Sequence, residues 1–393
     1  MRNKNMNTNN KTAEYVIIGA GPAAICAIPN LLKIGIDKNK IIWIDPQFKV
    51  GDFGSILSEG SSVPGNTMAK SYQRVNQEIY KILPTLKPEN DRSFELNQLL
   101  PNHVGSLKIA AAPLQHITNG LREIINSIQG TVSHIESLSN GLSINIQTEN
   151  NQLITLKTKR VILATGATPK TYCLPENHKN IMMINSNIAF IQSELANYLK
   201  EQKTIKSIAV IGSSHSAALA TMHLLKAGII VKQFMNKEYK YASPAVTADG
   251  KEYTQYDNTG LKGDVAKFTK DLLEDINSNR GLYQNKLTRY IAKNREELAQ
   301  LLDQHLSDCS HAVATIGYQP SHTLQINGRY VTELKHNNKT TAFEDINGLF
   351  GIGIAFPQWV KSISGEEEPA VGVEKFWNTT SNQMVLDTWQ KLI

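Results

Sequence analysis

The sequence predicts an α/β fold with two Rossmann-like three-layer units, of which the second is inserted into the first. Two short apolar runs, at residues 14–18 and 207–212, each lead into a turn and then into a stretch with helical spacing. A further apolar run follows each helix, at residues 41–45 and 229–234, which is the pattern of two parallel strands joined by a helix. The 393 residues are too many for one compact core and suit two.

Composition places the chain among globular proteins and excludes several partners. Hydrophobic residues make up 41% and charged residues 19% of the chain. The net charge of +6 is spread thinly, without a block of Lys and Arg interleaved with aromatic residues, so no nucleic-acid partner is expected. The polar N-terminus reads as a disordered leader, and glycines and prolines interrupt the next apolar run, so no membrane partner is expected.

Cysteine usage limits the chemistry further. Cys26, Cys173 and Cys309 lie far apart, which excludes a CxxC redox pair and argues against a disulfide framework. No His-rich cluster has the spacing of metal ligands, so no metal site is predicted. The pattern predicts a reducing, cytoplasmic compartment.

The first unit begins with a strand at residues 14–18 and a turn with the pattern GxGxxA at residues 19–24. Gly19 permits the tight turn, Gly21 lets the backbone approach a pyrophosphate, and Ala24 allows helix and strand to pack closely. The N-terminus of the following helix offers N–H groups and a positive dipole end to phosphates. The sequence therefore predicts a dinucleotide site, and the alternative is a glycine-rich turn that binds none.

An acidic residue ends the second strand of this unit. Asp45 is placed to accept hydrogen bonds from a ribose diol, at a separation from the glycines close to the usual one. The alternative is an ordinary solvated carboxylate at the end of a strand.

The next part of the chain continues the first unit. Residues 46–113 are irregular and rich in Gly and Pro, which predicts a segment that wraps a ligand. Residues 117–128 predict an amphipathic helix. Three alternating runs between residues 131 and 166 predict a small antiparallel layer that returns to a buried strand.

The second glycine-containing turn, at residues 212–217, also follows a strand and opens a helix. Ser213 and Ser214 replace expected glycines, so they offer N–H groups and hydroxyls but narrow the close approach. His215 could contact a pyrophosphate or lie on the surface at a helix start. A unit that no longer binds a nucleotide is the alternative.

The strand after this turn lacks an acid at its end and has Lys232, Asn236 and Lys237 nearby. A carboxylate would repel a 2′-phosphate and a positive group would accept it, so NADPH is favoured over NADH. Lysines at a solvated strand end are the alternative.

The remaining elements set the predicted boundaries. A polar stretch at residues 236–263 precedes helices near residues 265–276 and 295–306, and then a strand at residues 311–320. The chain ends in short strands and a helix that starts near Glu368. The first unit then covers residues 1–170 and 318–393, and the second unit covers residues 171–317.

The order of these motifs resembles that of flavoproteins with two dinucleotide-binding domains, in the pyridine nucleotide-disulfide oxidoreductase-like superfamily. Residues 159–166 (KRVILATG) resemble the strand at their domain crossover, and residues 346–353 (INGLFGIG) resemble their C-terminal flavin-contacting strand. The resemblance covers nearly the whole chain. It implies FAD in the first unit and NADPH in the second, and a helix beginning at residues 368–373 whose N-terminus faces the flavin.

The cofactor-binding residues that this resemblance implies come from both units. They are Gly19, Gly21, Pro22, Ala23, Ala24, Asp45, Pro46, Gly51, Phe53, Asn66, Thr67, Val132, Ala164, Thr165, Gly166, Gly212, Ser213, Ser214, His215, Ser216, Lys237, Gly317, Tyr318, Gly353, Ala370 and Val371.

Within this group the chain resembles the flavin-containing and N-hydroxylating monooxygenases more than the reductases. The reductases relay electrons through a CxxC pair, which is missing here, and usually carry an Asp after the C-terminal GxG, where this chain has Ile354 and Ala355. Residues 49–55 resemble the monooxygenase GGxW segment, with Phe53 as the aromatic residue. Residues 314–320 (ATIGYQP) resemble the ATGYxP segment with an inserted Ile316 and do not choose between the branches.

The resemblance implies a monooxygenase that forms a flavin peroxide and oxygenates a small nucleophilic substrate. Asn66 is a candidate donor to the flavin peroxide, and Lys70 or Arg74 could hold an anionic group; the alternative for each is ordinary loop structure. A flavin reductase or dehydrogenase that passes electrons to a protein or quinone, and a regulatory flavin-binding protein, stay open. The substrate and the oligomeric state do not follow from the sequence, and a homodimer stays open.

Overall fold

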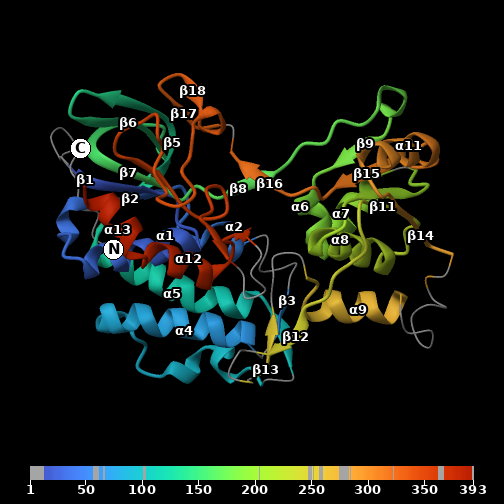
Figure 1. Ribbon diagram of the computed structural model, residues 1–393, viewed down its shortest axis with the longest axis horizontal. Helices are drawn as coiled ribbons and strands as arrows, with labels where there is room; N and C mark the ends of the chain where they lie inside the picture. Colours follow the sequence, from blue (N-terminus) through green and yellow to red (C-terminus); the bar gives the residue numbers. More distant parts are fainter. Residues whose placement is uncertain are drawn as a thin grey trace.

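Two separate sheets form two units that lie side by side (Figure 1). The structure is a computed structural model. It describes residues 13–55, 62–64, 67–100, 103–202, 204–246, 250, 252–255, 260–273, 283, 285–321, 323–361 and 367–391. The predicted N-terminal leader, residues 1–12, therefore lies outside the described residues.

The first sheet has eight strands in the order β18-β17-β5-β2-β1-β7-β19, with β6 beside both β5 and β7. Its strands are β1 (Ala13–Ile18), β2 (Ile41–Asp45), β5 (Asn126–Leu138), β6 (Gly141–Thr148), β7 (Leu153–Leu163), β17 (Gln325–Ile326), β18 (Arg329–Tyr330) and β19 (Leu349–Gly351). The pairs around β1 are parallel, as the buried apolar runs predicted.

Strands β5 and β7 are long because each serves two layers. The start of β5 pairs with β2 in parallel, and the rest of it pairs with β6 in the antiparallel direction. Strand β7 does the reverse, pairing first with β6 and then with β1 and β19. The predicted antiparallel layer is thus confirmed as β5-β6-β7, continuous with the parallel sheet.

The second sheet is fully parallel, in the order β14-β11-β10-β15-β9. Its strands are β9 (Met182–Ile184), β10 (Ile208–Ile211), β11 (Val231–Met235), β14 (Leu287–Ile291) and β15 (His311–Ala314). The order of β14, β11, β10 and β15 repeats that of β5, β2, β1 and β7 in the first sheet. The internal repeat read from the sequence is therefore a repeat of topology.

Helices cover both sheets (Figure 1), and the described residues also form four small antiparallel strand pairs. The helices are α1 (Pro22–Lys33), α2 (Gly51–Gly54), α4 (Thr67–Ile82), α5 (Lys108–Ile124), α6 (Ser186–Phe190), α7 (Gln192–Glu201), α8 (His215–Lys226), α9 (Gly263–Leu273), α11 (Arg295–His305), α12 (Val373–Thr380) and α13 (Gln383–Gln390). The pairs are β3 (Ser62–Pro64) with β4 (Val104–Ser106), β8 (Ala167–Pro169) with β16 (Tyr318–Pro320), β12 (Ser243–Val246) with β13 (Glu252–Gln255), and β20 (Trp359–Lys361) with β21 (Glu367–Pro369).

Three predictions of secondary structure were wrong. The segment at residues 46–113 is not irregular throughout, because it contains α4, whose apolar residues face α1 and α12. Helix α5 starts nine residues before the predicted position and tolerates Pro113 within it. The last part of the chain forms strand β21 at Glu367–Pro369, and α12 begins only at Val373, after a Gly372 with a φ of 117°.

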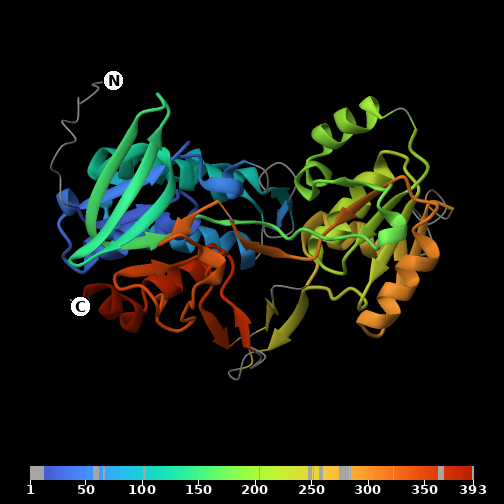
Figure 2. The same cartoon turned by 90° about the horizontal axis from the view of Figure 1, so that it is seen from above.

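Strands β8 and β16 connect the two units by pairing with each other, in antiparallel register between Ala167 and Pro320. Viewed from above, the two connections cross between the units (Figure 2). All strands of the second sheet lie between residues 182 and 314. This supports the division at residues 170 and 318, which remains our proposal for the domain boundaries.

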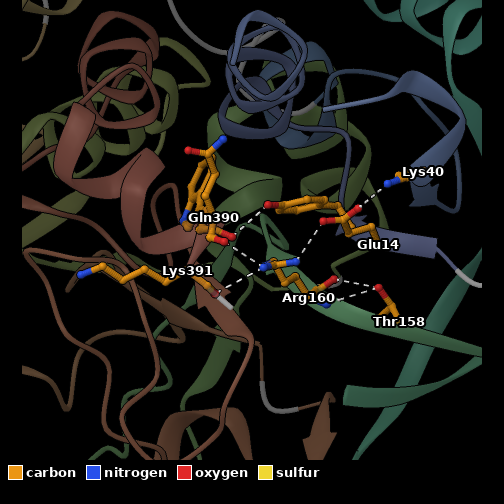
Figure 3. A network of polar contacts seen from close by, with 8 residues as sticks. Glu14, Lys40, Thr158, Arg160, Gln390 and Lys391 are labelled. Carbon is orange, nitrogen blue, oxygen red and sulfur yellow. Dashed lines mark hydrogen bonds and ion pairs between the residues drawn. The ribbon is translucent and has the colours of Figure 1, made fainter. Parts of the chain in front are cut away.

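The end of the chain is tied to the first sheet by Arg160, whose side chain is 5% exposed. Its guanidinium donates to the carbonyl oxygens of Gln390 (2.9 Å) and Lys391 (3.3 Å) and pairs with Glu14 (3.3 Å), as Figure 3 shows. Lys40 lies 3.1 Å from the same carboxylate. A cation at the C-terminal end of α13 stabilises that helix, since its last carbonyls have no partner within the helix.

Candidate functional site

The first glycine turn, residues 19–24, contains two glycines with different surroundings. Gly19 has a φ of 103°, and a Cβ there would lie 2.3 Å from the Ala164 carbonyl oxygen. A Cβ on Gly21 would meet nothing within 4 Å. The protein itself therefore requires glycine at position 19 but not at position 21. The open space at Gly21, at the N-terminus of α1, fits a pyrophosphate group.

Asp45 holds the backbone around this turn. Its Oδ2 accepts from the Ala20 N–H (2.8 Å), and its Oδ1 accepts from the N–H groups of Gln47 (2.8 Å) and Phe48 (2.6 Å). A carboxylate offers about four lone-pair sites, so one site stays for a ribose hydroxyl. Asp45 is thus more than a solvated strand-end carboxylate, because it also ties the turn to the loop after β2.

The loop after β2 has a strained backbone beside the turn. Phe48 and Val50 have φ values of 55° and 60°, in the left-handed region that a β-branched residue such as Val rarely adopts. Such conformations cost about 1–3 kcal/mol each and cluster at functional sites. They bring Gly51 onto Gly21, since a Cβ on Gly51 would lie 3.3 Å from the Gly21 Cα.

Several other predicted FAD residues lie in or near the first turn. Pro22 starts α1, and Ala23 and Ala24 are buried in it. Gly353, with a φ of 85°, lies against the same helix, because its Cβ would come within 2.9 Å of the Ala23 Cβ. Ala164, Thr165 and Gly166 follow β7 directly, beside Gly19.

The remaining predicted FAD residues are spread more widely. Pro46 is exposed after β2, and Phe53 packs edge-on against Tyr72 of α4 at 5.8 Å. Val132 is buried in the core beneath β5-β6-β7. Ala370 is buried, and Val371 lies just before α12, whose start differs from the prediction.

The two residues predicted to take part in catalysis remain predictions. Asn66 lies outside the described residues, and Thr67 begins α4. Lys70 is exposed on α4. Arg74, the alternative candidate for binding an anionic group, forms an ion pair with Glu374 of α12. Its positive charge is therefore already balanced by a carboxylate of the protein.

The second glycine turn, residues 212–217, repeats the first in its backbone. Gly212 has a φ of 147°, and a Cβ there would lie 2.7 Å from the Thr315 carbonyl oxygen, which corresponds to the contact of Gly19 with Ala164. Ser214 precedes α8 with an extended backbone, as Gly21 precedes α1. The serines therefore occupy their positions without backbone strain.

The side chains of the second turn differ from those of the first. Met235 ends β11 where Asp45 ends β2, and it is fully buried. The hydroxyl of Ser213 instead donates to the amide oxygen of Asn236, the next residue. The strand end thus carries no acid, which suits a nucleotide with a 2′-phosphate.

His215 and Ser216 form the first turn of α8. The Nδ1 of His215 is buried and has no hydrogen-bond partner among the described residues. Burial, helped by the charge of Lys262, lowers the pKa of His215 to about 4. A neutral imidazole with an unused nitrogen can accept or donate a hydrogen bond to a bound group.

The structure separates the two lysines that were predicted near a 2′-phosphate. Lys237 is exposed just beyond the carboxyl end of β11. Lys232 lies near the amino end of that strand, where its Nζ contacts Asp308 (2.7 Å) and donates to the His305 carbonyl (3.1 Å). Ligands bind at the carboxyl ends of parallel strands, so the prediction that Lys232 could accept the 2′-phosphate was wrong.

The residues after β15 repeat those after β7. Because Ile18 pairs with Leu163 and Ile211 with Ala314, Thr315 corresponds to Ala164 and Gly317 to Gly166. Both glycines have positive φ values, 68° and 98°. Within the repeat, Ile316 is therefore the equivalent of Thr165.

A surface groove of about 540 Å³ lies away from both glycine turns, at the C-terminal ends of α1, α4 and α5. It is lined by Leu32, Lys33, Lys38, Glu78, Lys81, Ile82, Leu83 and Ile124. Lysines near helix C-termini interact favourably with the helix dipoles. The lysines of this groove are therefore explained without a bound ligand.

Other kinds of site are missing from the part of the chain that the structure describes. No group of three His, Cys, Asp or Glu residues there could hold a metal ion. Cys26, Cys173 and Cys309 are all free. No described helix is long and apolar enough to cross a membrane.

Together, the two repeated glycine turns define a class of protein, the α/β proteins with two sites of the kind that hold nucleotide diphosphates. The pyridine nucleotide-disulphide oxidoreductase family matches residues 13–346, and the chain belongs to this family. The protein is thus an oxidoreductase, and the family expected from the motifs is confirmed.

Relatives support the same assignment. Monooxygenase AgnR1 of Paecilomyces divaricatus is 29% identical over 385 residues, which cover 92% of this chain and 94% of that protein. The fold is similar to that of DfoA, a cadaverine monooxygenase from Erwinia amylovora, with a TM-score of 0.61 and 12% identity over 97% of this chain and 95% of that one. It is also similar to the bacillithiol disulfide reductase Bdr of Bacillus cereus, with a TM-score of 0.54 and 13% identity over 96% of this chain and 99% of that one. The predicted fold class is confirmed.

Proposed function

We propose that the protein is an FAD-dependent monooxygenase that uses NADPH and oxygenates a small nucleophilic substrate. The observation that carries the proposal is the contrast between Gly19 and Gly21. The first glycine is required by a neighbouring backbone carbonyl, whereas the second faces open space at a helix N-terminus. A glycine that the protein's own packing does not require fits the close approach of a cofactor phosphate.

The residues around the first turn fit FAD. The N–H groups in the first turn of α1 would face the pyrophosphate, and the fourth lone-pair site of Asp45 would accept a ribose hydroxyl. Gly353 would let the segment after β19 lie close to Ala23. Bound FAD would supply electron transfer from NADPH to oxygen.

The second turn fits NADPH. The N-terminus of α8 offers N–H groups, Ser213 and Ser214 add hydroxyls, and no acid ends β11. Lys237 is exposed just beyond the carboxyl end of β11 and would offer a positive charge to a 2′-phosphate.

Two observations favour a monooxygenase over a disulfide reductase. The chain has no CxxC pair, the arrangement through which the reductases relay electrons. The curated relative that matches along nearly the whole chain is a monooxygenase. Three unpaired cysteines also support our proposal of a cytoplasmic compartment.

Purified protein tests the proposal directly. We expect flavin absorbance in the pure protein, and NADPH oxidation that consumes oxygen and rises when an amine or another small nucleophile is added. The oxygenated product would be identified by mass spectrometry. The variant Gly21→Val serves as the control, because it should be colourless and inactive while remaining folded.

Two outcomes would decide against the proposal. Protein that binds no flavin under any condition would remove the central claim. Oxidation of NADPH with quinones or a protein acceptor, but without oxygen uptake, would instead identify a reductase or dehydrogenase.

A further inference from the structure

Gln233 is a polar side chain in the middle of the second sheet. It is fully buried in β11, which pairs with β10 on one side and with β14 on the other. Its Nε2 donates to the Tyr239 hydroxyl and lies 3.5 Å from the Gly212 carbonyl oxygen, whereas its Oε1 has no hydrogen-bond partner among the described residues. Exchanging the two ends of the amide would only move the missing partner to the other atom. Buried polar groups are normally hydrogen-bonded, so this side chain calls for a further partner.

The internal repeat places Gln233 where the first sheet has Trp43. Each precedes the residue whose carbonyl accepts from the first glycine of the turn, at 2.8 Å for Gly19 and 2.9 Å for Gly212. Trp43 is also fully buried, and its Nε1 donates to the Gly19 carbonyl oxygen at 2.7 Å. A side-chain N–H thus faces the carbonyl of the first glycine in both repeats. An amide is smaller than an indole, so the same place in the second unit holds less side-chain volume.

A small cavity lies beside Gln233. Residues of α8, α9, β11 and β14 enclose it, together with Tyr239. The space open to the centre of a water molecule is about 10 Å³. This is about the space that one water needs, and it is too little for a larger ligand.

Three buried polar atoms that have no hydrogen-bond partner in the described part of the chain belong to residues that line this cavity. They are Thr221 Oγ1 of α8, Gln233 Oε1 of β11 and Arg289 Nε of β14. The Arg289 atom can only donate, the Gln233 atom can only accept, and the Thr221 hydroxyl can do either. One water can accept from Arg289, donate to Gln233 and form a third bond with Thr221. Buried waters typically make about three hydrogen bonds to otherwise unsatisfied groups, which matches this set of atoms.

The walls of the cavity also hold the segment that follows β11. Arg289 forms an ion pair with Glu238, and its guanidinium lies 5.7 Å from the centre of the Tyr239 ring. Gln233 donates to the hydroxyl of the same tyrosine. Lys237, the residue expected at a 2′-phosphate, comes directly before these two held residues. The orientation of Gln233 and Arg289 therefore constrains where Lys237 lies.

We propose that Thr221, Gln233 and Arg289 bind one buried water, and that this water positions the segment after β11 for the 2′-phosphate. Hydrogen bonds to the water hold the Gln233 amide and the Arg289 guanidinium in the orientation in which they contact this segment. The three residues are then positioning residues for Lys237. The water site stands on the protein's own atoms, whereas its effect on the nucleotide rests on the proposed use of NADPH.

A crystal structure of the purified flavin-containing protein, at a resolution that shows ordered waters, tests the site itself. We expect one water within about 3.2 Å of Gln233 Oε1 and of Arg289 Nε. Gln233→Met keeps the length of the side chain and removes both polar atoms, so this variant should lose the water. Thr269→Val is the matched control. Thr269 also lines the cavity, but its hydroxyl already donates to the Val265 carbonyl oxygen at 2.7 Å, so the water should remain in this variant.

Isothermal titration with NADP⁺ and NAD⁺ tests the effect on the nucleotide. Gln233→Met should bind NADP⁺ roughly three- to tenfold more weakly, because a displaced Lys237 loses part of one hydrogen bond, and it should bind NAD⁺ about as tightly as the natural protein. Starting from Lys237→Ala, the same change should have little further effect, since the group that is positioned is already gone.

Milder variants keep the test free of folding defects. Thr221→Val removes only one ligand of the water and should give a smaller loss of NADP⁺ binding in the same direction. Thr269→Val should leave both affinities unchanged. Unaltered flavin content and melting temperature would show that the variants fold.

The possible failures have different meanings. A natural protein without water density in the cavity would remove the water site. If Gln233→Met loses NADP⁺ and NAD⁺ binding equally, the side chain acts on the glycine turn through Gly212, and if it loses neither, the segment is not positioned in this way; the proposed function stands in both cases. If the natural protein binds neither nucleotide, NADPH use fails and the positioning role fails with it, while a water seen in the crystal would still confirm the site.

Discussion

The two glycine turns share one backbone and carry different side chains. In both, the first glycine takes a positive φ and lies on the backbone of the next parallel strand, at Ala164 or at Thr315. Its N–H donates to the end of the neighbouring strand, at 2.8 Å in the first turn and 2.9 Å in the second. The close packing of neighbouring backbone segments requires this first glycine, so this part of the motif is the same in both turns.

The positions that face a ligand are the ones that diverge. Gly21 is replaced by Ser214, and the acid Asp45 is replaced by the buried Met235. A polar link between the turn and the strand end is kept in each, through Asp45 in the first and through Ser213 and Asn236 in the second. The comparison shows that a glycine motif combines residues that the fold requires with residues whose identity can vary with the bound cofactor.

The largest expected effect is a difference in stability between valine variants of Gly19 and Gly21. Gly19→Val would force a branched side chain into a positive φ and onto the Ala164 carbonyl, which should lower the free energy of unfolding by more than about 3 kcal/mol. Gly21→Val should cost about 1 kcal/mol or less, because the side chain meets nothing. It should nevertheless abolish FAD retention. Urea unfolding and flavin absorbance of both variants measure this.

Gly212→Val extends the comparison to the second turn. It should destabilise the fold as Gly19→Val does, since the Thr315 backbone lies in the same place. Retained flavin in Gly21→Val, or equal stability of all three variants, would break the distinction between the two glycine positions.

The second prediction puts a charge where the two turns differ. Asn236→Asp keeps an acceptor for the Ser213 hydroxyl and places a carboxylate beside the expected 2′-phosphate. We expect a tenfold to hundredfold higher KM for NADPH, on the order of 1.4–2.8 kcal/mol, with little change for NADH. Stopped-flow reduction with both nucleotides would reveal the difference, and an equal loss for both would contradict a 2′-phosphate site.

The smallest expected effect concerns the two lysines. Lys237→Ala should weaken NADPH binding about tenfold, the value of one charge-assisted hydrogen bond of about 1.5 kcal/mol, and leave NADH nearly unchanged. Lys232→Ala is the matched control, because its side chain is engaged with Asp308 at the other end of the strand. Equal effects of both variants would show that Lys237 acts only through the overall charge.

Much of the fold could be predicted because its signals are local. A buried run, a glycine and a helix stand together in the sequence, so both turns and their flanking strands were recognised. Helix α4 was missed because it lies between segments with many glycines and prolines. The start of α12 was misplaced because Pro369 ends a strand, whereas Gly372 provides the helix start.

Contacts between distant segments could not be predicted. The partner of Lys232 is Asp308 and that of Arg74 is Glu374, and no local pattern shows either pair. Tyr318 was predicted only as a cofactor residue, and the fold shows that it packs against the cores of both units.

The anchoring of the chain end by Arg160 has a consequence for the order of folding during synthesis. The carbonyls that this buried charge needs belong to Gln390 and Lys391, and β19 and α12 of the first unit also come late in the chain. The first unit therefore cannot close until these residues have been synthesised, although its glycine turn emerges first. The second unit has all its strands between residues 182 and 314 and can fold earlier on the ribosome. The synthesis of α12 and α13 would then be the step that completes the first unit.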